Sequence, residues 1–336
     1  MNRRTAGLRA ATVILVLAAS ATGCSSGVAS SGGAAATPVS LGYIADYSGS
    51  AAFAVAAKQG LWAKQGLKPD LKVFTNGPLQ VQALGAGDLD FGYVGPGALW
   101  LPASGKAEIV AVNMLGQADR VIARPGSGIT KPAGLKGKKV AVPDGTSGDM
   151  ILNLALEQAG LKPGDITRVS MDPGTVVTAF SSGQVDAAAI WYPLIDTIRK
   201  RVPDLVEVTR TQDFYPKLTF PSAFVTRPGL PADNPALVKK VTTVLREADD
   251  WIAAHPQDSE KVTADFLKLP ADQLAGSTKY VKIMSSADLA KLTQDGTVDG
   301  WFNRLADVFV TMGKLKAPGD AKDYYLGSQY QAATAK

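Results

Sequence analysis

The tetrapeptide Gly-Leu-Lys-Pro occurs twice in this chain of 336 residues, at 66–69 and at 160–163. Each copy follows an apolar segment, then a polar Gly/Ser loop that contains aspartate, then a run of helix-forming residues. We interpret the apolar segments as strands and the runs as helices that end at the glycine of the tetrapeptide. The predicted strands are 39–44 and 139–142, and the predicted loops are 46–50 and 144–148. The pattern indicates a duplicated α/β unit.

A second pair of matching segments follows at a constant offset of 96 residues, LGAGDLDFGYVGPG from position 84 and FSSGQVDAAAIWYP from position 180. Both contain Gly-x-(Leu/Val)-Asp before a short apolar run, which predicts a helix end and then a buried strand. Strands that alternate with helices favour parallel sheets. We therefore expect an α/β fold of two similar lobes, each a mostly parallel sheet flanked by helices.

Ligands of open α/β sheets bind beyond the carboxyl ends of the strands. The predicted loops at those ends are 46–50, 95–97, 144–148 and 191–193. Several lead into helices, whose first N–H groups are unpaired and favour negative charge. A cleft between the lobes could therefore hold a small anionic group. Thr146 and Ser147 could equally serve as helix caps, and the two roles are compatible.

Three segments, 58–95, 134–161 and 181–193, resemble the solute-binding proteins of ABC importers for aliphatic sulfonates, taurine and nitrate. The resemblance implies a two-lobed, type II periplasmic-binding-protein-like fold that has two hinge crossovers and closes around its ligand. It also implies delivery of the ligand to an ABC permease and its ATPase subunits. The implied lobes are 39–117 plus 224–336 and 118–223, with helical patterns at 235–254 and 298–314 packing on the first.

The same resemblance implies which residues meet the ligand. They are Tyr47, Ser48, Ser50, Gly95, Pro96, Gly97, Thr146, Ser147 and Trp191. Where members of the family often have an acidic residue after this tryptophan, the present chain has Tyr192. Trp191 and Tyr192 could wall the pocket against an apolar part of the ligand, whereas packing in an aromatic core is the alternative for Trp191.

The charges of the loops narrow the range of possible ligands. Asp46, Asp144 and Asp149 would repel a multiply charged anion, although Asp149 could simply stabilise a helix N-terminus. A singly charged sulfonate, or a zwitterion whose ammonium meets Asp46 or Asp144, fits better. Taurine or a short alkanesulfonate is the leading prediction, and a neutral or cationic compound such as a thiamine-precursor pyrimidine is the alternative. Replacing Asp46 by alanine should weaken an amino-sulfonate more than its amine-free analogue.

The N-terminus predicts export. Arg3, Arg4 and Arg9 precede a short apolar run and then Cys24, the only cysteine. Residues 1–23 read as a signal peptide, and their end resembles a bacterial lipobox, which implies that Cys24 is lipidated. Residues 24–38 would then form a flexible tether on the outer face of the cytoplasmic membrane. A simple cleaved signal with an incidental cysteine is the alternative.

Other functional classes are disfavoured. The three signal arginines supply most of the net charge of +5, and no basic cluster with interleaved aromatics predicts nucleic-acid binding. The single histidine, His255, lacks a plausible metal partner, and none of the common hydrolase or P-loop spacings is present. We expect a monomeric binding protein without catalytic residues, metal or cofactor. An enzyme on the same fold and a surface interaction module remain the rivals.

Overall fold

A computed structural model describes residues 35–333. The predicted signal peptide and Cys24 lie outside the described residues. Strand β1 (Thr37–Ile44) begins at Thr37, so the tether cannot extend to residue 38 as the sequence suggested. Thr37 and Pro38 already pair with Leu67 and Lys68 of β2 (Leu67–Phe74), which explains the earlier start of the strand. Within residues 35–333, no helix combines the length and hydrophobicity that crossing a membrane requires.

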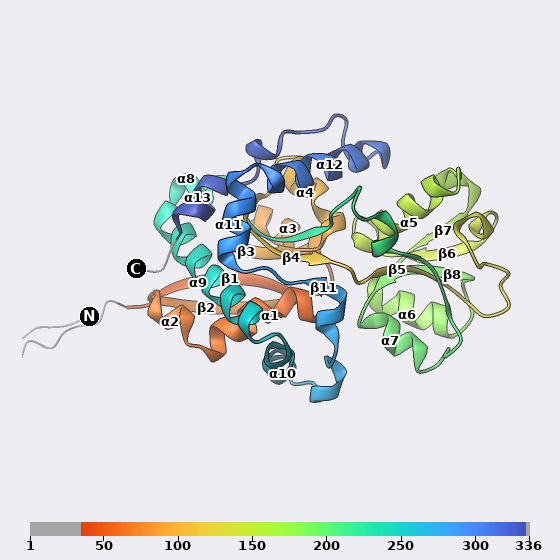
Figure 1. The fold of residues 1–336 in the computed structure, drawn as a ribbon, viewed down its shortest axis with the longest axis horizontal. Coiled ribbons are helices and arrows are strands. Elements are labelled where there is room, and N and C mark those ends of the chain that lie inside the picture. Colours follow the sequence, from red (N-terminus) through yellow and green to blue (C-terminus); the bar gives the residue numbers. More distant parts are fainter. Residues whose placement is uncertain (1–34, 334–336) are drawn as a thin grey trace, which may run out of the picture. The chain divides into compact units, whose positions relative to one another are not determined.

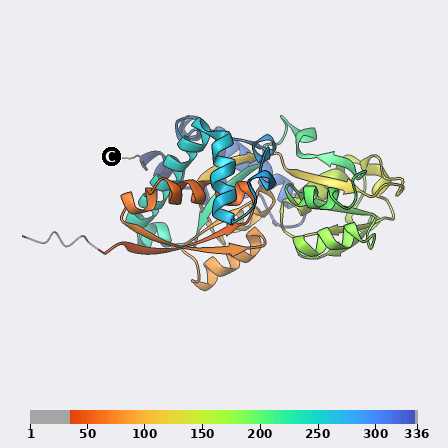
Figure 2. The same ribbon diagram turned by 90° about the horizontal axis from the view of Figure 1, so that it is seen from below.

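Two mixed sheets organise the described chain (Figures 1 and 2). The first has the order β11-β4-β10-β3-β1-β2, and the second β7-β6-β8-β5-β9. The other strands of the first sheet are β3 (Phe91–Val94), β4 (Glu108–Gly116), β10 (Pro221–Thr226) and β11 (Val281–Lys282). Those of the second are β5 (Asp119–Ala123), β6 (Lys139–Val142), β7 (Thr167–Ser170), β8 (Ala187–Trp191) and β9 (Val206–Arg210). We call residues 37–116 with 221–333 the first lobe, and residues 119–210 the second lobe.

The duplication is visible in the topology. Strands β2, β1 and β3 are parallel neighbours in the first lobe, and β7, β6 and β8 repeat the arrangement in the second. Most strands of each sheet run in one direction, as expected, but both sheets also contain strands of the opposite direction and are therefore mixed. The strand that arrives by each crossover, β5 after β4 and β10 after β9, runs opposite to both of its neighbours. The repeat predicted the parallel strands but carried no information on the inserted ones.

The second crossover lies earlier than predicted. Because β10 belongs to the first sheet and begins at Pro221, the second lobe ends before the expected boundary at 223. The first crossover is the short link between Gly116 and Asp119, close to the expected boundary at 117. Pro221 to Thr226 is buried throughout, because β10 lies between β3 and β4.

Helices cover both sheets. The α-helices are α1 (Tyr47–Lys58), α2 (Leu61–Lys64), α3 (Gly77–Ala86), α4 (Trp100–Ala103), α5 (Ser147–Gln158), α6 (Pro173–Ser181), α7 (Leu194–Arg199), α8 (Leu230–Asp233), α9 (Pro235–Ala254), α10 (Pro256–Leu267), α11 (Ser286–Gln294), α12 (Thr297–Thr311) and α13 (Gly327–Ala332). Short 3₁₀ turns include η1 (Pro96–Ala98), η4 (Thr211–Phe214) and η6 (Ser277–Tyr280). The predicted loops 46–50 and 144–148 are shorter than expected, because α1 and α5 already begin at Tyr47 and Ser147.

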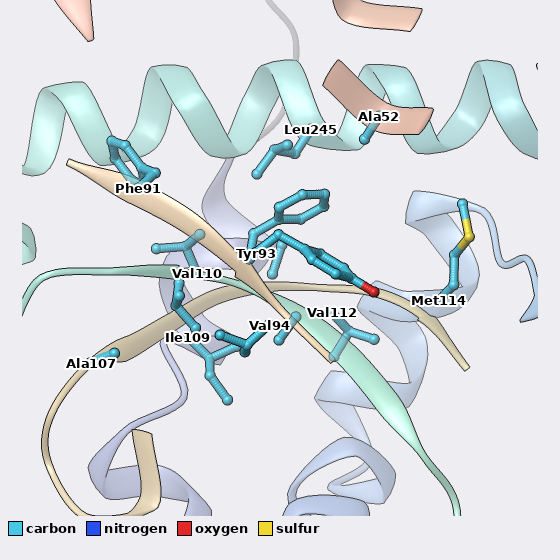
Figure 3. Close-up of a cluster of buried hydrophobic side chains, with 14 of the residues drawn as sticks. Ala52, Phe91, Tyr93, Val94, Ala107, Ile109, Val110, Val112, Met114 and Leu245 are labelled. Carbon is cyan, nitrogen blue, oxygen red and sulfur yellow. The ribbon is translucent and has the colours of Figure 1, made fainter. Parts of the chain in front are cut away.

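The predicted helix 235–254 is confirmed as α9. Asn234 begins it by accepting a hydrogen bond from the Leu237 N–H at 3.0 Å, and Pro235 fits the first helical position. Its apolar face, which includes Leu245, packs on the core of the first lobe. Figure 3 shows Leu245 above Tyr93 of β3, with Phe91 of the same strand to one side and Val112 of β4 below. This burial fixes the strands whose ends carry the site.

The aspartate of the repeated Gly-x-(Leu/Val)-Asp motif has the same role in both lobes. Asp90 accepts hydrogen bonds from the Ser40 N–H and hydroxyl, both at 2.9 Å, and its own N–H donates to the Ser40 carbonyl at 3.0 Å. Asp186 accepts from the Lys139 N–H at 2.8 Å and donates to the Lys139 carbonyl at 2.9 Å. Each aspartate thus ties its helix end to the central strand.

Replacing Asp90 by alanine should lower the free energy of unfolding by about 1–3 kcal/mol, because two donors on Ser40 lose their partner. Urea unfolding followed by circular dichroism measures this. Asp88→Ala, two residues away on the exposed surface, is the matched control and should change stability by less than about 0.5 kcal/mol. Equal losses in the two variants would contradict the tie to the central strand.

Candidate functional site

Helix N-termini gather at the carboxyl ends of the central strands. Asp46 follows β1 and is the N-cap of α1, because its Oδ1 accepts from the Gly49 N–H at 2.7 Å. Asn76 follows β2 and caps α3 in the same way, accepting from the Leu79 N–H at 3.1 Å. Helix α5 begins beyond β6, with Thr146 at its N-cap position. All three helices leave free N–H groups at their first turns.

A cleft of about 560 Å³, part of it open to solvent, lies where these termini meet. Both lobes line it. The first lobe contributes Ile44, Asp46, Ser48, Asn76, Gly77, Tyr93, Gly95, Pro96, Ala98, Gly116 and Ser222. The second lobe and the first crossover contribute Ala118, Asp119, Thr146, Ser147, Trp191 and Tyr192. The cleft is therefore lined by polar and aromatic groups from both lobes.

Most of the predicted site residues line this cleft. They are Asp46, Ser48, Gly95, Pro96, Thr146, Ser147, Trp191 and Tyr192. Thr146 does not act as a side-chain cap, because its hydroxyl donates to the Pro143 carbonyl at 2.6 Å. Trp191 is 8% exposed, so its ring belongs to the core of the second lobe and also lines the cleft.

Three predicted residues do not line the cleft. The Tyr47 side chain is buried, and its hydroxyl lies 2.6 Å from the Ser259 hydroxyl of α10. Ser50 donates to the Ile44 carbonyl at 2.7 Å within the first turn of α1. Gly97 packs against the start of α5. For Tyr47 and Ser50, the first turn of α1 directs the side chain away from the cleft, which the interpretation of this segment as an open loop could not anticipate.

Two of the three carboxylates considered from the sequence also lie outside the cleft. Asp144 and Asp149 do not line the cleft, because both pair with Arg168, Asp149 at 2.9 Å. Partial burial acts to raise the pKa of Asp144, but hydrogen bonds from Ser170 and Arg168 and the charge of Arg168 outweigh it and lower that pKa below its ordinary value. The buried Asp149 also accepts from the Gly145 N–H at 2.8 Å, so it stabilises the start of α5.

Sequence reasoning missed four polar residues of the cleft, namely Asn76, Tyr93, Asp119 and Ser222. Asp119 is 3% exposed and follows the first crossover. Its backbone N–H donates to the Thr211 hydroxyl at 3.2 Å, which anchors the start of β5. The repeat offers no signal for Asp119, because the crossover strands lie outside the duplicated pattern.

Asp46 and Asp119 make the cleft acidic. Burial raises the pKa of each carboxyl from its ordinary value to about 6. The Trp191 side chain and the Gly49 N–H act against this rise at Asp46, as the Ser147 side chain does at Asp119. The described residues that line the cleft include no lysine, arginine or histidine. An occupant with a positive group would therefore neutralise two buried carboxylates.

Arg120, which follows Asp119 in the sequence, does not line the cleft. Arg120 donates to Glu207 at 3.0 Å and to the Gln117 carbonyl at 2.8 Å. Its guanidinium lies 5.4 Å from the ring centroid of Tyr192, which stacks on Tyr280 of η6 at 4.0 Å. Tyr192 donates to Glu207 at 2.6 Å. This cluster fixes the Tyr192 ring and links the second lobe to the C-terminal part of the first.

The lobes also touch on the α5 side of the cleft. The Trp100 Nε1–H of α4 donates to the Gly145 carbonyl at 3.2 Å, and Lys314 pairs with Asp149 at 3.1 Å. A Cβ placed on Gly97 would lie 2.2 Å from the Thr146 carbonyl oxygen. The structure thus holds the start of α5 directly against the first lobe.

Comparison with known proteins places the chain in a family. Residues 48–259 match the family described as NMT1/THI5 like. A Brucella abortus protein, named only as a binding protein, is 56% identical over 295 residues, which cover 88% of this chain and 92% of that protein. The chain belongs to the NMT1/THI5-like family. The taurine-binding periplasmic protein of Escherichia coli is 26% identical to this NMT1/THI5-like chain over 82% of this chain and 88% of that protein.

Solved structures show the fold. The periplasmic aliphatic sulphonate binding protein SsuA from Escherichia coli superposes with a TM-score of 0.64 at 24% identity, over 88% of this chain and 99% of that one. The desulfurization enzyme DSZB has a TM-score of 0.62 at 16% identity, over 88% and 98%. The NMT1/THI5-like chain therefore has the periplasmic-binding-protein fold, which confirms the resemblance inferred from the sequence.

Proposed function

We propose that this protein is the exported solute-binding component of an ABC importer, and that it captures a small amino-sulfonate such as taurine in the cleft between its lobes. Lipidated Cys24 would anchor it outside the cytoplasmic membrane, and an ABC permease with its ATPase subunits would receive the ligand. Relatives named as binding proteins support the role, and the taurine-binding relative supports the ligand class.

One observation carries the ligand class. The cleft sets two buried carboxylates, Asp46 and Asp119, beside helix N-termini, without a cationic side chain among the described lining residues. A sulfonate can accept hydrogen bonds from the N–H groups at the start of α5 and α3. An ammonium on the same molecule can pair with the carboxylates. A zwitterion matches both the helix N-termini and the carboxylates. Sulfate or an amine-free sulfonate has no positive group, so the two carboxylates would repel it.

The alternative ligand is a cationic or neutral aromatic amine, such as a thiamine-precursor pyrimidine. Trp191, Tyr93 and Tyr192 all line the cleft and offer aromatic surface next to the two carboxylates. This arrangement would suit a flat, protonated ring. The importer role is the same for both ligands, and only the anionic end of the molecule distinguishes them.

Thermal unfolding of the protein lacking residues 1–24 tests the proposal. Taurine should raise the melting temperature by several degrees at about 100 times its dissociation constant, because it binds only the folded state. Ethanesulfonate should produce a smaller rise, and sulfate and nitrate none. A rise in melting temperature with the aminopyrimidine alone would indicate an importer component for the alternative ligand.

Two other results would overturn the proposal. The absence of any shift across sulfonates, oxyanions and pyrimidines would favour a surface interaction module. Conversion of a bound compound during prolonged incubation would favour an enzyme, as in DSZB, whereas recovery of unchanged taurine by mass spectrometry is the expected result.

A further inference from the structure

A second, apolar cavity adjoins the ligand cleft. It encloses about 670 Å³, part of it open to solvent, and shares Ile44, Asp46 and Trp191 with the cleft. We call it the apolar annex and define it by Ile44, Val73, Phe74, Trp191, Pro193 and Leu194. Both lobes contribute to it, because Val73 and Phe74 end β2 while Leu194 begins α7. A group seated there would touch both lobes.

The annex exposes apolar surface that the fold does not require. Val73 is 61% exposed, and it and Leu79 are the large hydrophobic side chains left exposed in the described chain. Val73 lies at the annex, whereas Leu79 lines neither cavity. Val73 therefore adds its apolar surface to a cavity whose other lining residues are mainly apolar.

The charge at the boundary specifies the occupant. Asp46 lies where the cleft and the annex meet, and the annex contains no other ionisable residue among its described lining. The starts of α5 and α3, where we place the sulfonate, line the cleft but not the annex. An apolar group in the annex would therefore extend from the cationic end of the ligand and not from its sulfonate.

We propose that the annex binds an apolar substituent carried on the nitrogen of the ligand, so that the protein prefers N-alkylated or N-cycloalkylated amino-sulfonates over taurine itself. The inference rests on the proposed function, since it assumes an ammonium at Asp46. The substituent would lie between Val73 of the first lobe and Leu194 of the second, and its burial would add to the interactions of the charged groups.

Isothermal titration with four probes tests this inference. Two are taurine and N-cyclohexyltaurine. The other two are 1-hexanesulfonate, which has apolar carbon but no amine, and cyclohexylamine, which has the ring and the amine but no sulfonate. N-cyclohexyltaurine should bind about tenfold or more tightly than taurine, because the ring removes apolar surface from water. The hexanesulfonate should bind more weakly than either, since its chain cannot extend from an ammonium at Asp46.

The variant Val73→Ser should reduce the advantage of N-cyclohexyltaurine by about threefold and change the taurine affinity by less than about twofold. Leu79→Ser removes the other exposed side chain and should change neither value. Taurine that binds as tightly as N-cyclohexyltaurine, or an advantage that survives Val73→Ser, would overturn the annex while leaving the proposed function intact. Binding of cyclohexylamine without any binding of taurine would contradict an amino-sulfonate ligand but would support an apolar subsite at the annex. No binding by any probe would overturn both.

Discussion

Replacing Gly97 by alanine should weaken ligand binding by about 100-fold while the protein stays folded. The added Cβ would lie 2.2 Å from the Thr146 carbonyl oxygen and 2.4 Å from the nitrogen and Cα of Ser147. These are backbone atoms, so no side-chain rotation can relieve the overlap. If the overlap raises the free energy of the lobe arrangement seen here by about 3 kcal/mol, the apparent affinity falls by about two orders of magnitude.

A matched glycine provides the control. Gly85 lies in α3, and a Cβ placed there meets no atom within 4 Å, so Gly85→Ala should bind normally and gain up to about 1 kcal/mol of stability. Titration calorimetry with the tightest-binding sulfonate measures the affinities. Small-angle scattering should also give a larger radius of gyration for Gly97→Ala, because its lobes separate. Wild-type affinity in Gly97→Ala would show that the approach of η1 to α5 is not needed for binding.

Replacing Asp119 by asparagine should weaken taurine binding by about 10- to 100-fold, because the ammonium loses a charged partner in a buried site. Ethanesulfonate, which has no ammonium, should bind as well or better, since a repelling charge has gone. Asp46→Asn should act in the same direction and is a cleaner test than alanine, because asparagine preserves the cap that Asp46 provides to α1.

Asp70→Asn, at an exposed carboxylate on β2, controls for the change in net charge and should affect neither ligand. Titrations of both ligands against the three variants separate the possibilities. Equal losses for taurine and ethanesulfonate in Asp119→Asn would contradict an ammonium contact. Such equal losses would indicate that Asp119 has a structural role at the start of β5 and does not contact the ligand's ammonium.

The same two carboxylates make binding depend on pH. Burial raises the pKa of Asp46 and Asp119 to about 6, above the value near 4 expected in the unfolded chain. Protonation therefore stabilises the ligand-free fold below about pH 4, and this contribution is lost as the pH rises through about 6. An ammonium ligand needs the ionised forms, so its affinity should rise over the same range and should be about tenfold lower at pH 5 than at pH 7.5 for each carboxylate that must ionise.

The sequence alone determined the repeated parts of the fold. The offset of 96 residues predicted that β3 and β8 would occupy equivalent places, and both are the third member of a parallel group of three strands. The periodicity of α9 and the apolar run of β6 were equally readable. These features depend on local propensity and burial, which neighbouring residues in the chain encode.

Only the tertiary structure decided what the crossovers bring together. Asp119 and Ser222 begin or lie in strands that enter the sheets from the opposite lobe, so no local pattern marks them as part of the cleft. Conversely, Tyr47 and Ser50 looked like loop residues, but the first turn of α1 points them away from the cleft. The physical reason is that a site between lobes depends on which strand ends meet in space. Strand ends that meet can be far apart in the sequence, so spacing along the chain does not indicate which of them form the site.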